Sequence, residues 1–174
     1  VGLNPYKSFR SKFERMEGFI TLLHLFAYFT VAGAILITDK LWGRFFNTSI
    51  VASVMMSFYG MLQLGGKIII NQGGVRLDGT FGNATYLAVY MLFHIFLTLF
   101  LLFRHKGSVF IKYLYGIAIF FQLFALYHTA TRGAILGLIA GLILAFLLIA
   151  VFEKESRTLK KTSLGLLAGI VIFL

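Results

Sequence analysis

The sequence contains no cysteine, and its only proline is Pro5. The lack of cysteine excludes disulfide bonds and cysteine-ligated metal centres. The lack of later prolines leaves long helices uninterrupted. Charged residues are also scarce, at 13% of the chain against about a quarter in a soluble domain. Acids are the rarest, with 6 against 16 lysines and arginines.

Hydrophobic residues make up 59% of the chain, and phenylalanine alone contributes 20 of its 174 residues. Runs of about 20 apolar residues suffice to cross a bilayer. The pattern predicts an all-α, polytopic membrane helix bundle with five full transmembrane helices and the start of a sixth. The expected helices lie near 18–38, 47–66, 84–103, 109–128 and 133–152, with the sixth in 163–174.

Residues 1–17 are basic and aromatic, which favours an interfacial segment at the membrane surface. Binding of an acidic lipid-linked substrate is the alternative reading of this segment. We expect 1–174 to form a single transmembrane domain within a longer chain, because it opens on Val1 and its last apolar run stops at Leu174. The net charge of +10 would suggest nucleic acid in a soluble protein. Here most cations lie between apolar runs, so membrane lipids are the expected partner and nucleic acid is not.

Counting the spans assigns the loops to two sides of the membrane. One side carries nine cations, namely Lys40, Arg44, Arg104, Lys106, Lys112, Lys154, Arg157, Lys160 and Lys161. The other side carries three, Lys67, Arg76 and Arg132, or seven when the four cations of residues 1–17 are added. The positive-inside rule therefore places the nine-cation side in the cytoplasm and the other side outward.

Two polar stretches fall on the outward side, RLDGTFGNATYLA at 76–88 and HTATRGA at 128–134. Each precedes an apolar run, and Asn83 or Thr85 is placed to cap the first of these helices. Thr129 or Thr131 is placed to cap the second, with Arg132 in its first turn. Helix N-termini with glycine-rich backbone bind phosphate, and arginine adds paired hydrogen bonds. We interpret the two stretches as the edges of one anion-binding site.

The alternative is that Arg76 and Arg132 are ordinary interfacial arginines that contact lipid head groups. Asp78 and His128 are the nearest titratable groups and are weak candidates for a proton acceptor. Pairing of Asp78 with Arg76 or Lys67 is the more ordinary expectation for that carboxylate.

Further polar residues stand inside or near the spans, and we expect these to face the bundle interior and find partners there. They are His24, His94, Gln63 and Gln122. Small residues at spacing four, Ser49, Ser53 and Ser57 on one run and Gly133, Gly137 and Gly141 on another, indicate helix packing faces. No histidine pair has the spacing of a helical metal site, so we predict no metal and no cofactor.

The two motifs, RLDGTFGNATYLA and TATRGAILGLIAGL, resemble the O-antigen ligase and O-antigen polymerase family of bacterial membrane proteins. That family typically shows Arg-x-x-Gly-Thr-Phe-Gly-Asn-Pro-Asn before a membrane helix, and Thr-x-Ser-Arg-Gly-Ala opening a glycine-spaced helix. Ala84 and Thr85 replace Pro-Asn here, and Thr131 replaces the serine. The segment SFRSKFERMEGFITLL at 8–23 is also similar to the region before an early helix of the family.

The resemblance implies a metal-independent glycosyltransferase in the bacterial cytoplasmic membrane, with the motif loops facing outward. Its donor would be a glycan on undecaprenyl diphosphate, and its acceptor lipid A core, a growing glycan or a protein. Arg76 and Arg132 would stabilise the leaving diphosphate. The implied substrate-binding residues are Gly79, Thr80, Gly82, Asn83, Thr131 and Lys67. A catalytic histidine and a further arginine would lie in an external loop beyond residue 174.

Two other classes of protein remain open. A transporter or flippase for an anionic lipid or solute would use the same arginines without chemistry. A scaffold subunit of a cell-envelope complex would need only the glycine packing faces.

Overall fold

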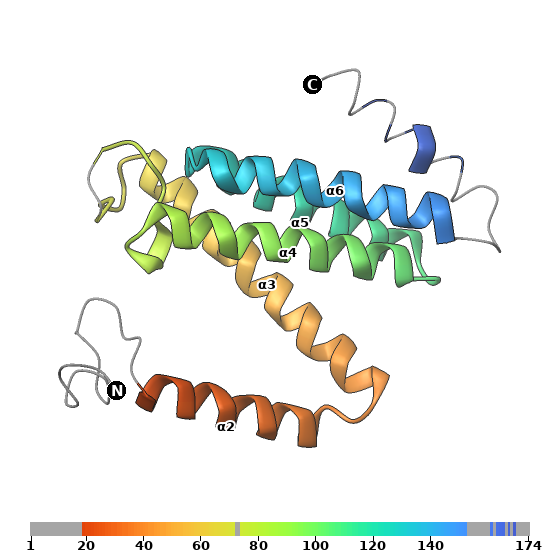
Figure 1. The fold of residues 1–174 in the computed structure, drawn as a ribbon. Helices are drawn as coiled ribbons and strands as arrows, with labels where there is room; N and C mark the ends of the chain where they lie inside the picture. The colour runs from red at the N-terminus through yellow and green to blue at the C-terminus, as the bar shows by residue number, and fades with distance from the viewer. Residues whose placement is uncertain are drawn as a thin grey trace, which may run out of the picture. The chain divides into compact units, whose positions relative to one another are not determined.

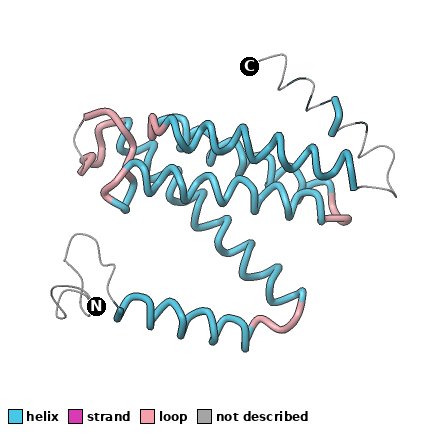
Figure 2. Tube along the Cα trace, in the orientation of Figure 1, coloured by secondary structure: helices cyan, strands magenta, loops and turns pink. Residues whose placement is uncertain are grey.

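The structure is a computed structural model that describes residues 19–71, 74–152, 161, 163–165, 167 and 169. Its elements are α2 (Phe19–Ile35), α3 (Asp39–Leu64), the 3-10 helix η1 (Gly79–Phe81), α4 (Ala84–Arg104), α5 (Val109–His128) and α6 (Arg132–Phe152) (Figure 1). The described part of the chain contains helix and loop and no strand (Figure 2), which confirms the predicted helical fold. The predicted interfacial segment 1–17 and most of 153–174 lie outside the described residues.

Four helices, α3 to α6, are long and apolar enough to cross a membrane. They contain 20 to 26 residues. At a rise of 1.5 Å per residue, they extend over about 30–39 Å, against a hydrocarbon core of about 30 Å. A membrane helix bundle is thereby confirmed. The last three predicted spans agree with the observed helices within one residue.

The first two predicted spans differ from the described helices. The expected span 18–38 overlaps α2, whose described residues Phe19–Ile35 number 17, so four spans are supported among the described residues and five full spans stay a prediction. The expected span 47–66 is α3, which begins eight residues earlier, at Asp39. Residues 39–46 are therefore helix and not the predicted loop. Their charges lower the local hydropathy without breaking a helix, and Thr38 Oγ1 accepts a hydrogen bond from Leu41 N at the helix start.

The chain divides into two compact units, Val1–Asn47 and Thr48–Leu174, and α3 crosses the boundary. Within the second unit, α4 and α5 form an antiparallel hairpin joined by residues 105–108, and α6 returns along α4 (Figure 1). The core of this unit consists of buried apolar residues, namely Leu77, Leu87, Ala88, Met91, Ile95, Ala125, Leu126, Ala134 and Leu138. Leu77 is the one member of this core that comes from a loop, so the core itself anchors the polar loop before α4.

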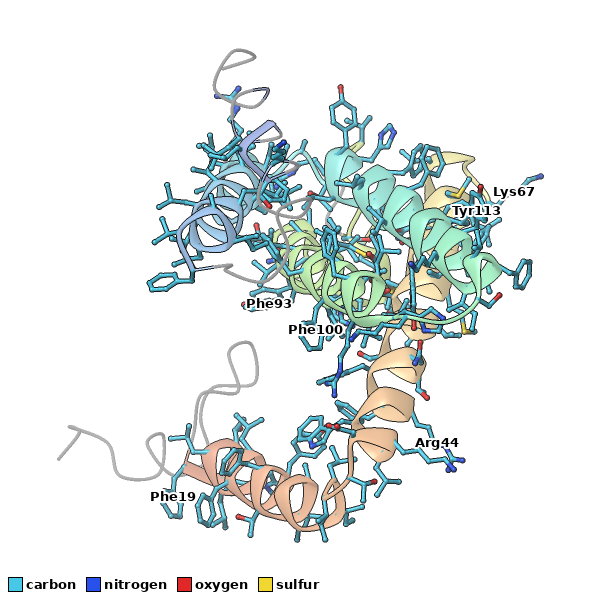
Figure 3. All side chains as sticks on the ribbon, turned by 90° about the vertical axis from the view of Figure 1, so that its right-hand side faces the viewer. Phe19, Arg44, Lys67, Phe93, Phe100 and Tyr113 are labelled. Atoms are coloured by element: carbon cyan, nitrogen blue, oxygen red, sulfur yellow. The ribbon has the colours of Figure 1, made fainter. Side chains whose placement is uncertain are left out.

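Large apolar side chains cover the outside of the helices, as expected for lipid contact. Phe93, Phe100 and Tyr113 are exposed and point outward (Figure 3). The glycine spacing of α6 receives side chains of α4: a Cβ at Gly141 would stand 2.5 Å from Phe96 Cζ. Gly141 therefore lies at a helix contact, as the glycine spacing predicted, whereas Gly133 faces open space among the described residues.

A row of buried hydrogen bonds joins α3, α4 and α5. Gln122 Nε2 donates to Ser53 Oγ at 2.8 Å and to Thr98 Oγ1 at 3.0 Å. Ser49 Oγ lies 2.8 Å from His94 Nε2. The serine spacing thus provides hydrogen bonds as well as close packing, and these residues find the interior partners that the sequence analysis expected. His24 does not follow that expectation, since its Nδ1 lies 2.7 Å from the Ile20 carbonyl of its own helix.

Candidate anion-binding site

The two polar stretches meet at one end of the second unit. Leu77 N donates to the carbonyl oxygen of His128 at 3.1 Å. Arg76 Nε donates to the carbonyl oxygen of Thr129 at 2.9 Å, and its Nη2 donates to Thr131 Oγ1 at 3.1 Å. The loop before α4 is therefore hydrogen-bonded along the turn between α5 and α6. The sequence analysis placed both stretches on one side of the membrane, and the structure brings them into contact.

The α5–α6 turn is built by residues 129–131. Thr129 is the C-cap of α5, and its Oγ1 donates to the Leu126 carbonyl at 2.6 Å. Ala130 has a φ of 49°, the left-handed conformation that lets the chain reverse within so few residues. The carbonyl of Thr131 then accepts from Ala134 N and Ile135 N in the first turn of α6. Thr129 accordingly ends one helix, and only Thr131 stands where the next begins.

Arg132 is the first residue of α6, and it is exposed. No hydrogen bond or ion pair engages its guanidinium within the part of the chain that the structure describes. Its Cα lies one peptide unit, about 3.8 Å, from that of Thr131, whose hydroxyl holds Arg76. Two cations are thus brought to the N-terminus of one helix, whose first N–H groups have no partner within the helix. This is an electrostatic environment that favours an anion.

Arg76 is half-buried, and its two hydrogen bonds engage only some of the N–H donors of its guanidinium group. A guanidinium has five N–H donors, and the bonds to Thr129 and Thr131 engage two of its nitrogens. The bonded edge fixes the plane of the group, and the remaining donors can reach phosphate oxygens. Such a preoriented arginine loses little side-chain entropy on binding.

Gln63, near the end of α3, holds the other side of the loop. Its Nε2 donates to Asp78 Oδ1 at 2.7 Å and to the Ile69 carbonyl at 3.0 Å, while its Oε1 accepts from Gly79 N at 3.0 Å. Asp78 is fully buried. The sequence analysis considered Arg76 and Lys67 as partners of Asp78 and did not connect it with Gln63. The contact with Gln63 makes Asp78 an anchor of the loop.

Glycine is required at the next turn of the loop. Gly79 has a φ of +57° and is buried, and a Cβ there would stand 3.0 Å from Met56 Sδ. Gly82 also has a positive φ, +63°, but lies in open space. Thr80 is exposed, with its Oγ1 3.6 Å from Met56 Sδ. These conformations turn the chain back so that α4 begins directly after the loop.

Asn83 is the N-cap of α4, and its side chain accepts from Thr85 N at 2.8 Å. Of the two candidates for the cap of this helix, Asn83 and Thr85, the observed cap is Asn83. Residues 67–71 and 74–77, which lead from α3 into this loop, are loop as well. Lys67 is exposed just after α3.

His128 contributes to the site mainly through its backbone. Its carbonyl accepts from Leu77 N, while its ring lies against Phe124, with centroids 4.5 Å apart, and Tyr127, at 5.3 Å. Within the described residues, no group of three or more histidine, cysteine or acidic side chains could hold a metal ion. What the arrangement offers is cationic and backbone hydrogen-bond donors around an exposed helix N-terminus.

Comparisons with protein-family models, curated proteins and solved structures found no match for this chain.

Proposed function

We propose that this chain belongs to a membrane enzyme that transfers a glycan from a lipid diphosphate carrier to an acceptor at the outer face of a bacterial cytoplasmic membrane. The observation that carries the proposal is the pair of hydrogen bonds that hold Arg76 on Thr129 and Thr131, the latter being the residue before Arg132 in the chain. Two guanidinium groups on one helix N-terminus match the charge and the hydrogen-bonding capacity of a diphosphate. The motif resemblance adds undecaprenyl diphosphate as the carrier and lipid A core, a growing glycan or a protein as acceptor.

Glycosyl transfer from a lipid diphosphate needs a site that stabilises negative charge on the leaving diphosphate. In glycosyl transfer, an acceptor oxygen forms a bond to the anomeric carbon while the bond from that carbon to the phosphate oxygen breaks. The electron pair of the broken bond stays on the diphosphate, whose negative charge therefore increases. Fixed cationic donors stabilise this charge more in the transition state than in the bound substrate. Arg76 and Arg132 are assigned that role.

The other residues of the site are assigned to shape and recognition. Gly79 and Gly82 give the loop its course, and Asn83 begins α4 beside it. Thr131 orients Arg76, and Thr80 and Lys67 are exposed where they can contact the donor. The acceptor hydroxyl must lose a proton in the reaction. Asp78 is buried against Gln63 and His128 packs on aromatic rings, so we assign the base to an external loop outside this sequence, as the resemblance implies.

The test uses the full-length protein in liposomes with an undecaprenyl-diphosphate-linked glycan and a candidate acceptor. Release of the lipid diphosphate is followed for the parent, Arg76→Ala and Arg132→Ala, with Arg104→Ala as a matched control at the other end of α4. We expect transfer by the parent and the control, and a loss of at least about 100-fold in the two site variants.

Transfer that persists in both site variants would reduce the two arginines to lipid contacts. If no acceptor supports transfer but the lipid crosses the bilayer, the alternative of a flippase replaces the enzyme. If neither activity depends on the arginines, the scaffold interpretation is favoured.

A further inference from the structure

The segment between α3 and η1 exposes large apolar side chains although it lies outside the helices. We call its described residues, 67–71 and 74–77, the α3–η1 loop. Ile69 is 82% exposed and Val75 84%, the highest values for large apolar side chains among the described residues. The sequence from residue 68 to residue 75 carries no charge. Because removing an isoleucine or valine side chain from water is worth about 1.5–3 kcal/mol, this surface favours a partner over water.

Hydrogen bonds hold the backbone of the α3–η1 loop at both exposed residues. Gln63 Nε2 donates to the carbonyl oxygen of Ile69 itself, at 3.0 Å. Leu77 N, two residues after Val75, donates to the carbonyl oxygen of His128 at 3.1 Å. The side chain of Leu77 is the one that enters the hydrophobic core from this loop. Ile69 and Val75 therefore project outward from an anchored backbone.

The lipid-facing surface of the membrane spans leads directly to this loop. Leu62 and Leu64, in the last turn of α3, are exposed apolar residues just before it. Tyr86 in the first turn of α4 and Tyr127 in the last turn of α5 are exposed at the adjoining helix ends. Tyrosine is enriched where spans leave the hydrocarbon, because its ring is apolar and its hydroxyl is polar. Figure 1 shows the loop where α3 ends and α4 begins, so it continues a surface with the composition of a membrane interface.

We propose that the α3–η1 loop is immersed in the membrane interface, with Ile69 and Val75 in contact with the acyl chains of membrane lipids. Arg76 follows Val75, and neighbouring Cα atoms are about 3.8 Å apart, so Arg76 then lies at the depth of the lipid head groups. A phosphate group carried by a membrane lipid can reach it without leaving the bilayer. The inference goes beyond the proposed function, because it concerns the surroundings of the loop and holds for an enzyme, a flippase or a scaffold alike.

The test locates single spin labels relative to lipid and water. The sequence contains no cysteine, so Ile69→Cys and Val75→Cys each introduce one labelling site into it. The full-length protein is placed in liposomes, and electron paramagnetic resonance measures collisions of each label with oxygen, which concentrates in acyl chains, and with a water-soluble nickel complex. Leu136→Cys, exposed inside α6, is the lipid-facing reference, and Lys106→Cys, exposed in the α4–α5 connection, is the aqueous reference.

We expect oxygen collisions to exceed nickel collisions at positions 69 and 75, as at position 136, and the reverse at position 106. An unchanged unfolding temperature shows that a labelled variant is folded, and each loop position tests the proposal separately. Dominant nickel collisions at both loop positions would place the loop in water and overturn the proposal. Few collisions with either reagent would show that protein covers the loop, and would overturn it as well.

Discussion

The Nε atom of Arg76 donates a 2.9 Å hydrogen bond to the carbonyl oxygen of Thr129, which lies 53 residues later in the chain. This bond joins the loop before α4 to the turn before α6, and a second bond from Nη2 to Thr131 completes the junction. Arg76 therefore has two roles. It joins the loop before α4 to the turn before α6, and it places a cation on Thr131, the residue before Arg132.

Replacement of Arg76 by lysine should separate these roles. Lysine keeps the charge but cannot make both bonds from a fixed plane. We expect Arg76→Lys to lower the free energy of unfolding by about 1–3 kcal/mol, as for two lost hydrogen bonds. Arg132→Lys, at an exposed position, should change it by less than about 0.5 kcal/mol. Thermal unfolding in nanodiscs measures both, and equal effects would contradict the junction.

Gln63 should be more important for stability than an ordinary buried amide. Gln63→Leu removes the side chain that donates to Asp78 and accepts from Gly79 N, so a buried carboxylate and a buried backbone N–H each lose a hydrogen bond. We expect a loss of about 3 kcal/mol. Gln122→Leu is the control, because its partners Ser53 and Thr98 are neutral hydroxyls, and hydrogen bonds within membranes average about 0.6 kcal/mol each. A larger effect at Gln122 than at Gln63 would contradict this assignment.

The α5–α6 turn should tolerate glycine better than alanine. Ala130 has a φ of 49°, which costs a residue with a Cβ about 1–2 kcal/mol and costs glycine little. Ala130→Gly should therefore raise the free energy of unfolding by about 0.5–1 kcal/mol. Ala140→Gly, at an exposed position inside α6, should lower it by about 1 kcal/mol. Destabilisation by both substitutions would argue against the left-handed turn.

Alanine at the two loop glycines should give unequal effects. Gly79→Ala and Gly82→Ala share the cost of a positive φ, about 1–2 kcal/mol. Only Gly79 also meets a neighbour, Met56 Sδ, at 3.0 Å from the new Cβ. We expect Gly79→Ala to be more destabilising by about 1–3 kcal/mol. Differential scanning fluorimetry orders the two variants, and the reverse order would be inconsistent with the burial of Gly79.

Sequence patterns predicted the last three spans because continuous apolar runs there end in polar turns. They failed at α3, whose first eight residues, Asp39 to Phe46, mix Lys40 and Arg44 with Trp42 and two phenylalanines. A hydropathy average treats such a stretch as a loop, although nothing in it breaks a helix. The aromatic rings contact one another, with Trp42 and Phe46 centroids 5.2 Å apart.

The residues of the candidate site could be singled out from the sequence, but the hydrogen bonds that join them could not. Motif spacing placed Arg76 and Arg132 on one side of the membrane, and Asn83 was readable as a cap from its position before an apolar run. The pairing of Gln63 with Asp78 depends on the approach of α3 to the loop, which no local pattern encodes. Thr129 looked like a cap for α6 because threonine favours helix N-termini, but the turn is so short that this residue still belongs to α5.

The most direct test of the account is the affinity of the full-length protein for undecaprenyl diphosphate, compared between the parent and Arg132→Gln. Arg132 has no hydrogen bond within the described residues, so its loss should leave the fold intact. We predict at least about tenfold weaker binding, as for one charge-assisted hydrogen bond, with an unchanged unfolding temperature. Unchanged affinity in the folded variant would contradict a diphosphate site formed by Arg76 and Arg132.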